Sequence, residues 1–239
     1  MGVDAAFAFL RKAIESGWDY PNGFARDPLL LPLRRDPRFE ALERAGRQNH
    51  KGNWGQAVYR VEEHLREGRL TEAERSVREH LAAIERVEGP SAGGWAVRAR
   101  WALAGCLILQ RRFEEAETLL VPTVAALRTE GRGGEEEWRT LALLVQCDLG
   151  LGRRDAALAH IAEIIEKSHP GMENVEILYA QAESEAINGN NEAALQLLAQ
   201  SSELGLADAE RLDHDLAFAE LRPRAQFQAI ALAVRKRAL

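Results

Sequence analysis

Residues 96–129 read AVRARWALAGCLILQRRFEEAETLLVPTVAALRT, and this stretch decides the fold. Residues 96–109 are apolar on nearly every side, which predicts a helix packed between several neighbours. The polar residues 110–112 are too few for anything but a turn between antiparallel helices. From Phe113 to Thr129 the apolar residues gather on one side of a second helix, which Pro122 is expected to kink or split because a helical amide is lost there. The stretch therefore predicts a helical hairpin.

The hairpin has a polar turn followed by an aromatic residue, Glu-Glu-Ala and Leu-Leu, and this order resembles the tetratricopeptide repeat (TPR). Three further stretches follow the same plan, at residues 54–86, 136–168 and 174–204, with turns expected at 67–70, 149–154 and 188–191. The alanines at the equivalent place after each turn are Ala73, Ala116, Ala157 and Ala194. Their spacing exceeds the ~34 residues usual for this repeat, which indicates longer helices and loops. The resemblance implies an all-α fold: a TPR-like right-handed superhelix of antiparallel helix hairpins.

Three local signals refine the expected boundaries. Thr71 and Glu74 fit a capping box at the start of one second helix, and Asp155 is expected to cap another. Residues 89–94, GPSAGG, are rich in glycine and proline and predict a loop.

Residues 27–42 read DPLLLPLRRDPRFEAL and resemble the segment, DPxxxxLRxDPRFxAL, that closes many bacterial TPR arrays. Within it, Asp36 is expected to cap a short helix that has Pro37 at its first position. The chain end carries a degenerate copy of the same segment, offset by a constant number of positions. The offset aligns these pairs: Leu10 with Leu198, Asp27 with Asp215, Leu33 with Leu221, Arg34 with Arg222, and Phe39 with Phe227.

This internal match predicts the domain organisation. Residues 1–47 would be the trailing half-repeat and closing segment of a preceding TPR array, and residues 48–239 an array of about four hairpins with a degenerate closing segment. The first helix would then lack its partner helix, which is expected if the chain is cut from, or starts within, a longer protein; alternatively, that helix caps the second array. An apolar face without a partner favours a homo-oligomer formed through the N-terminal helix.

Composition limits the partners. The formal net charge is −6 and the pI is about 5.6, which argues against direct nucleic-acid binding because such proteins usually carry a basic face. No secretory signal is visible, and no apolar run approaches the ~18 residues of a membrane span. Cys106 and Cys147 lie in apolar segments that are predicted to be helical. We expect free thiols in a reducing compartment there, unless adjacent hairpins bring the two cysteines face to face. We therefore expect a cytoplasmic protein.

Motifs for catalysis are not found. The glycine loops do not continue into a phosphate-binding P-loop, and the six histidines form no HExxH and no close pair. The two cysteines lack CxxC spacing, and no Gly-x-Ser-x-Gly elbow occurs. We expect no enzyme activity, no metal and no cofactor. An enzyme would need a buried titratable cluster, for instance Glu62 or Glu183 close to a histidine.

In a TPR superhelix the first helix of each hairpin lines a concave groove. The resemblance assigns to that groove Glu62, Arg98, Trp101, Arg139, Gln146, Glu176, Tyr179 and Glu183. Trp101 and Tyr179 would supply rigid apolar area, and Arg98 and Arg139 could each grip a carboxylate with two hydrogen bonds. The alternatives are that Trp101 belongs to the core and that the two arginines pair with glutamates of neighbouring repeats.

The favoured function is a scaffold or adaptor that binds a peptide or partner helix in the groove. Bacterial relatives of this kind often follow a kinase, cyclase or DNA-binding domain, so the resemblance implies a part of a larger multidomain protein. The alternative is a regulatory sensor that binds a small molecule or signal peptide and controls such an upstream domain. A sensor would need a deep pocket with convergent polar groups rather than an open groove.

Overall fold

A computed structural model describes residues 3–15, 33, 36–41, 61, 64, 67–86, 90–132, 134–167, 174–206 and 208–237. Most of these residues are helical and there is no strand among them, so the all-α expectation is confirmed. The chain divides into two compact units, Met1–Leu103 and Ala104–Leu239. No helix in the described residues is both long enough and apolar enough to cross a membrane.

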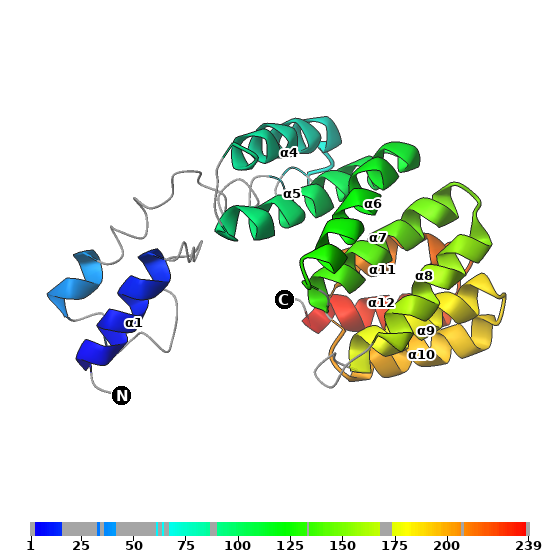
Figure 1. The fold of residues 1–239 in the computed structure, drawn as a ribbon. Helices are drawn as coiled ribbons and strands as arrows, with labels where there is room; N and C mark the ends of the chain where they lie inside the picture. Colours follow the sequence, from blue (N-terminus) through cyan, green and yellow to red (C-terminus); the bar gives the residue numbers. More distant parts are fainter. Residues whose placement is uncertain are drawn as a thin grey trace. The chain divides into compact units, whose positions relative to one another are not determined.

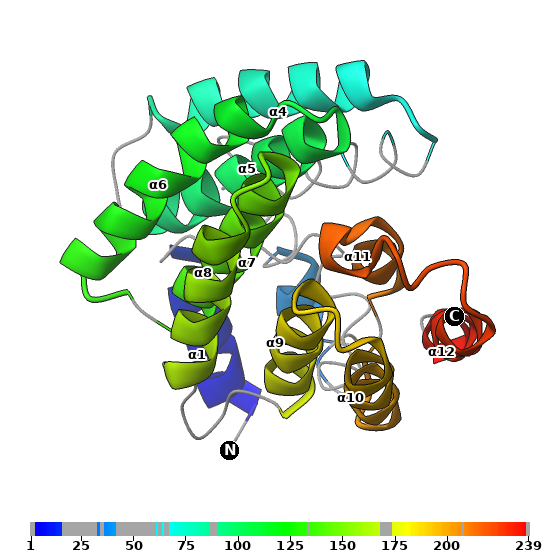
Figure 2. The same ribbon diagram turned by 90° about the vertical axis from the view of Figure 1, so that its right-hand side faces the viewer.

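The larger unit is a succession of antiparallel helices, coloured green to red in Figure 1. After α5 (Pro90–Leu109), which spans the division between the units, come α6 (Phe113–Thr129), α7 (Glu135–Gly150), α8 (Arg154–Glu166), α9 (Asn174–Ile187) and α10 (Asn191–Glu203). The chain then forms α11 (Ala209–His214), the short 3₁₀ helix η3 (Leu216–Phe218) and α12 (Ala225–Arg237). From α6 to α10 each helix packs against the next, and α12 packs on α10 and α11 (Figure 2). The smaller unit contains α1 (Val3–Glu15) and α4 (Leu70–Ile84).

The four expected hairpin turns share one backbone geometry. Two residues before the second helix the chain has a positive φ, at Gly68 (70°), Arg111 (60°), Gly152 (72°) and Gly189 (81°). The following residue donates its amide to the carbonyl five positions earlier, as in a Schellman helix end. The fourth residue of the second helix is an alanine that is fully buried in every hairpin: Ala73, Ala116, Ala157 and Ala194. These four alanines therefore occupy equivalent positions.

Three expectations about helix ends are wrong. The expected loop at 89–94 is helical from Pro90 onward, since the fixed φ of proline suits the first helical position. The helices α4 and α8 begin at Leu70 and Arg154, so Thr71 and Asp155 lie in the first turn, not at the cap. The shared turn geometry sets these starts, and the cap residues Arg69 and Arg153 make no side-chain cap hydrogen bond.

Of the two outcomes expected at Pro122, a kink or a split, the split does not occur, because α6 continues through Pro122. Pro122 and Thr118 are exposed. Thr118 is the residue whose carbonyl loses its amide partner, and on the exposed side water can satisfy that carbonyl.

The internal match has a structural counterpart. In the smaller unit a buried cluster consists of Phe7, Leu10, Leu33 and Phe39. The residues at the matching positions near the chain end, Leu195, Leu198, Leu221 and Phe227, are buried together in the core of the larger unit. Asp36 accepts a hydrogen bond from the Arg38 amide at 2.9 Å, so the expected cap is confirmed. The domain boundary expected at residue 47 lies outside the described residues and stays a prediction.

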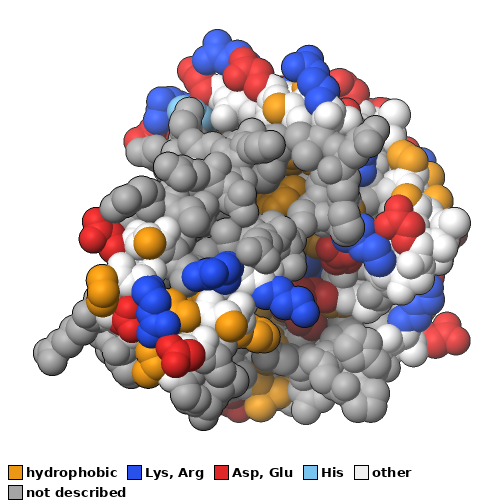
Figure 3. Space-filling model, turned by 60° about the vertical axis from the view of Figure 1, so that its left-hand side comes forward, with side chains coloured by type: hydrophobic (Ala, Val, Ile, Leu, Met, Phe, Trp, Pro, Cys, Tyr) orange, Lys and Arg blue, Asp and Glu red, His pale blue; other side chains and the backbone are white. Residues whose placement is uncertain are grey.

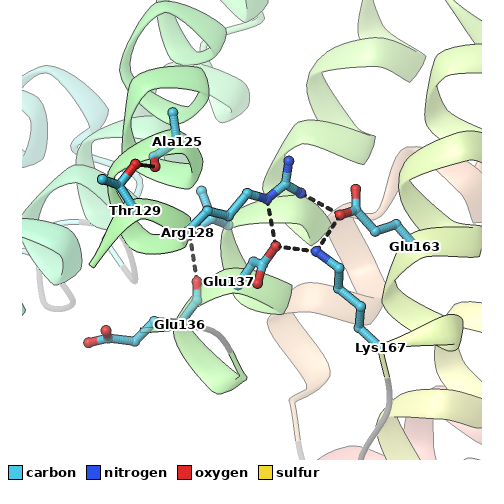
Figure 4. Close-up of polar contacts among 8 residues, drawn as sticks. Ala125, Arg128, Thr129, Glu136, Glu137, Glu163 and Lys167 are labelled. Carbon is cyan, nitrogen blue, oxygen red and sulfur yellow. Dashed lines mark hydrogen bonds and ion pairs between the residues drawn. The ribbon is translucent and has the colours of Figure 1, made fainter. Parts of the chain in front are cut away.

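A network of ion pairs joins α6, α7 and the end of α8 (Figure 4). Glu137 Oε1 accepts from Arg128 Nε and from Lys167 Nζ, each at 2.7 Å, and both cations also pair with Glu163. Burial of Glu137 acts to raise its pKa, but the hydrogen bonds from Lys167 and Arg128 outweigh burial and lower the pKa below its usual value. Glu137 therefore links three consecutive helices as an anion.

Candidate functional site

A polar cluster lies between the first helices of the last two hairpins, α7 and α9, and the segment that closes the chain. We call it the Asp215 cluster. Its members are Gln146, Glu176, Tyr179, Glu183, Arg211 and Asp215. The sequence assigned four of them, from Gln146 to Glu183, to the predicted groove, and the structure brings these four together.

Asp215 ties the closing segment to both helices. It lies in an extended conformation between α11 and η3 (φ −60°, ψ 120°). Its Oδ2 accepts a hydrogen bond from the Tyr179 hydroxyl at 2.9 Å, and its Oδ1 accepts from Gln146 Nε2 at 2.8 Å. The Leu216 amide donates to Gln146 Oε1 at 2.8 Å, so the amide side chain of Gln146 contacts two successive residues of the segment.

Arg211 adds a charged contact from α11. Its Cζ lies 3.9 Å from the centre of the Tyr179 ring, a cation–π distance. Its Nη1 pairs with Glu176 Oε2 at 2.7 Å, and its Nη2 lies 3.9 Å from Glu183 Oε2. One guanidinium thus pairs with Glu176 and lies close to a second carboxyl group of α9, that of Glu183.

Glu183 is the most deeply buried acid of the cluster, with 1% of its surface exposed. Neither of its carboxyl oxygens has a hydrogen-bond partner in the part of the chain that the structure describes. Burial, followed by the negative charge of Asp215, raises the pKa of Glu183 well above its usual value. Burial likewise raises the pKa of Tyr179, so this phenol remains a donor. The cluster therefore pairs a proton-retaining acid with a carboxylate.

The Asp215 cluster is an internal attachment. Tyr179 and Glu183 are buried, and the groups that surround them come from the chain's own closing segment. These two side chains do not face solvent, so an outside ligand cannot contact them directly while the segment is in place.

The other residues predicted for the groove lie elsewhere. Arg139 is half-exposed on α7, pairs with Glu135 of its own helix at 3.0 Å and lies over the Trp138 ring, 5.5 Å from its centre. Arg98 lies over the Trp95 ring in α5, at 5.6 Å. Trp101 is partly buried in α5. Glu62 lies outside the described residues.

The sequence reasoning did not assign Arg211, Asp215 and Arg222 to the site. Arg222 Nη2 donates to the backbone carbonyl of Asp215 at 2.5 Å. A signal existed, because the internal match aligned Asp215 and Arg222 with Asp27 and Arg34 of the first closing segment. That alignment marked the residues but not the helix partners of Asp215, Tyr179 and Gln146, which lie 36 and 69 positions away in the chain.

A hollow of about 390 Å³ lies beside this attachment. Leu149 and Ile187 at the ends of α7 and α9 contribute apolar surface to it, and Ala217 of η3 borders it. Arg154, Asn188 and Glu220 supply polar groups, and Arg154 Nη2 donates to Asn188 Oδ1 at 3.2 Å. The hollow is thus a mixed apolar and polar depression at the turn end of the hairpins.

Other reactive groups are few. Cys106 and Cys147 are free and buried, and burial raises the pKa of Cys147 to about 12, which keeps it a thiol. His160 Nδ1 lies 2.9 Å from Asp148 Oδ2. Within the described ranges, no group of histidine, cysteine or carboxylate side chains could hold a metal ion. On the face shown in Figure 3, side chains of both charge signs are interspersed.

Fold and site together define an all-α protein of consecutive helical hairpins. A C-terminal segment closes it and packs on α7 and α9, the first helices of the last two hairpins. No protein-family model matches the chain, and neither a curated protein nor a solved structure is significantly similar to it.

Proposed function

We propose that the chain is a TPR-type interaction module, a scaffold or adaptor that binds a peptide or partner helix on the face formed by the first helices of its hairpins. The repeated turn, with its positive-φ residue and its fully buried alanine, supports the TPR assignment. The regular packing of each helix on the next supports an array of repeats.

One observation carries the proposal: the first helices α7 and α9 already hold another piece of polypeptide, made of the extended residue Asp215 and the first residue of η3. Asp215 and Leu216 are bound there by the side chains of Gln146 and Tyr179, as a peptide ligand would be. A surface that binds one backbone segment through side-chain hydrogen bonds has the chemistry to bind another.

The equivalent positions in the other hairpins indicate what an outside segment would carry. One position lies at the same distance before the positive-φ residue in three hairpins. It is occupied by Glu176, Arg139 and Arg98. In α9 this position is Glu176, and a cation, Arg211, meets it. In α5 and α7 the position is an arginine that lies over a tryptophan ring. We therefore propose a peptide with acidic side chains, because a carboxylate suits an arginine as Arg211 suits Glu176.

The test is a selection of displayed peptides on the whole chain, followed by binding measurements with Arg139→Glu. The control is Arg78→Glu on the second helix α4, since Arg78 is also half-exposed and pairs with a glutamate four positions earlier. We expect acidic peptides, an about tenfold weaker Kd with Arg139→Glu, and a change of less than about twofold with Arg78→Glu. Failure to select any binding peptide, or equal weakening by both variants, would contradict the proposal.

The hollow beside η3 favours a second candidate function, a regulatory sensor that controls an effector domain. Its volume of about 390 Å³ is in the range of small-molecule sites. A compound that binds there should raise the unfolding temperature of the wild-type chain, and Ala217→Trp should abolish this rise by filling the hollow. Binding that survives Ala217→Trp would place the compound elsewhere.

A further inference from the structure

Glu183 of α9 is an acid that the fold buries without a hydrogen-bond partner. Its side chain is 1% exposed, and neither carboxyl oxygen has such a partner in the described part of the chain. The Nη2 atom of Arg211 lies 3.9 Å away, which is too far for a hydrogen bond. A buried carboxylate is costly unless it is paired and hydrogen-bonded. These surroundings therefore suit a neutral carboxylic acid and not an anion.

The titratable groups that face Glu183 are Tyr179 and Glu176 of its own helix and Arg211 and Asp215 of the closing segment. The side chains that α8 and α10 bury are alanine, leucine, isoleucine and serine, so these two helices bury no charge against α9. The guanidinium of Arg211 already pairs with Glu176 at 2.7 Å. Ionised Glu183 would thus add a third carboxylate, next to Asp215, to a group in which Arg211 is already paired.

The closing segment creates these surroundings when it docks. Asp215 of the segment approaches Glu183 closely enough for its negative charge to raise the pKa of Glu183, after burial as the larger cause. When the segment leaves α7 and α9, Glu183 gains contact with water and loses the charge of Asp215. The docked segment therefore favours the neutral acid, and by linkage the neutral acid favours the docked segment.

We propose that Glu183 is a pH-sensitive switch for the closing segment: the segment docks on α7 and α9 while Glu183 is neutral and opens more readily once Glu183 ionises. The proton leaves to solvent as the segment opens. Leu212 and Phe218 of the segment are buried in the core, so the open form is a minor one. Opening uncovers Tyr179 and Gln146, the side chains that hold the segment. The proposal does not depend on the proposed peptide binding, since it concerns a contact within the chain.

Hydrogen exchange of the whole chain tests the switch at the Leu216 amide, which donates to Gln146 Oε1 of α7 in the docked segment. The protection factor of this amide is its exchange rate in an unfolded peptide divided by the measured rate at the same pH. In the wild type the factor should fall about tenfold from about pH 6 to about pH 8. The reason is that each pH unit between the ordinary and the raised pKa of Glu183 changes the opening equilibrium by as much as about tenfold. In Glu183→Gln the factor should stay constant, because glutamine is neutral at every pH.

The matched control is Glu192→Gln of α10, which removes an exposed acid that also pairs with the chain end, through Arg224. It should keep the pH dependence of the wild type. Protection that is constant with pH in the wild type, or a fall that persists in Glu183→Gln, overturns the proposal. So does a Leu216 amide as well protected as the amides in the middle of α7, since the segment would then open only when the whole unit unfolds.

A second measurement follows the carboxyl group itself. The carbon-13 chemical shift of the Glu183 carboxyl carbon, assigned with Glu183→Gln, should give a pKa well above the ordinary glutamate value of about 4.3. A pKa near the ordinary value would mean that Glu183 ionises while the segment stays docked, and the proposal would be wrong.

Discussion

The Tyr179 hydroxyl of α9 donates a hydrogen bond to Asp215 Oδ2 at 2.9 Å, although 36 positions separate the two residues in the chain. The same tyrosine packs its ring edge-on against Phe218, with 5.4 Å between ring centres, and Phe218 in turn contacts Phe227 of α12. Tyr179 thus has a polar bond and an apolar contact to the closing segment. The segment is therefore part of the core of the larger unit.

Tyr179→Phe should lower the free energy of unfolding by about 1–2 kcal/mol, because it removes one donor from a buried carboxylate while keeping the ring. Asp215 would retain its bonds from Gln146 and from the Ala217 amide. Urea denaturation measures the effect, and the m-value should not change since the same surface is exposed. A loss below about 0.5 kcal/mol would show that water replaces the phenol without cost.

Glu183→Gln should make the protein more stable at neutral pH and less dependent on pH. Burial and the charge of Asp215 raise the pKa of Glu183 in the folded chain. The folded state therefore holds this proton more tightly than the unfolded state, and the stability that it contributes is present below the unfolded pKa and lost as pH rises toward the folded value. Glutamine remains neutral at every pH and avoids this loss.

Urea denaturation from about pH 5 to about pH 8 checks this, and the advantage of Glu183→Gln should grow with pH to about 1 kcal/mol or more. The matched control is Glu192→Gln, at an exposed position on α10, and its curve should parallel that of the wild type. An advantage of Glu183→Gln that is constant or shrinks as pH rises would mean that Glu183 ionises normally in the folded chain.

Glu137→Ala should cost about 2–3 kcal/mol, because Arg128 and Lys167 both lose a nearly buried partner. The neighbouring Glu136→Ala is the control: its partner Arg132 and Glu136 itself are both partly exposed, so its loss should stay below about 1 kcal/mol. Chemical denaturation of the two variants gives the comparison. Equal losses would mean that the three-helix network adds nothing beyond a single surface pair.

The stability that Glu137 contributes changes with pH in the opposite direction to that of Glu183. Despite burial, the hydrogen bonds from Lys167 and Arg128 lower the pKa of Glu137. Its contribution is therefore present above the unfolded pKa and disappears as pH falls through the folded pKa. The difference between wild type and Glu137→Ala should shrink below about pH 4. A difference that stays constant in acid would indicate lost packing in place of a lost ion pair.

Local patterns in the sequence predicted the parts of the fold that depend on local geometry. The four alanines after the turns were aligned correctly because their place depends on a turn of a few residues. Helical register likewise placed Gln146, Tyr179 and Glu183 on faces that the structure brings together. Their partner Asp215 was recognisable only as the residue that matches Asp27 in the internal repeat, because its contacts depend on how the closing segment folds back. The predictions that Thr71 and Asp155 cap their helices were wrong because a cap preference is worth only about 1 kcal/mol, and the preceding turn determined where each helix starts.

Arg111→Gly is expected to stabilise the protein by about 0.5–1 kcal/mol, because Arg111 alone among the four turn residues carries a side chain at positive φ. The other three positions are Gly68, Gly152 and Gly189. Glycine removes the clash of Cβ in this conformation, although the contact of the Arg111 guanidinium with the Phe113 ring, 5.8 Å from its centre, is lost. Arg111→Ala separates the two effects, since it keeps Cβ and removes the guanidinium. We expect the unfolding temperature to rise for glycine and to fall slightly for alanine. An alanine variant as stable as the glycine variant would show that the backbone at this turn is not strained.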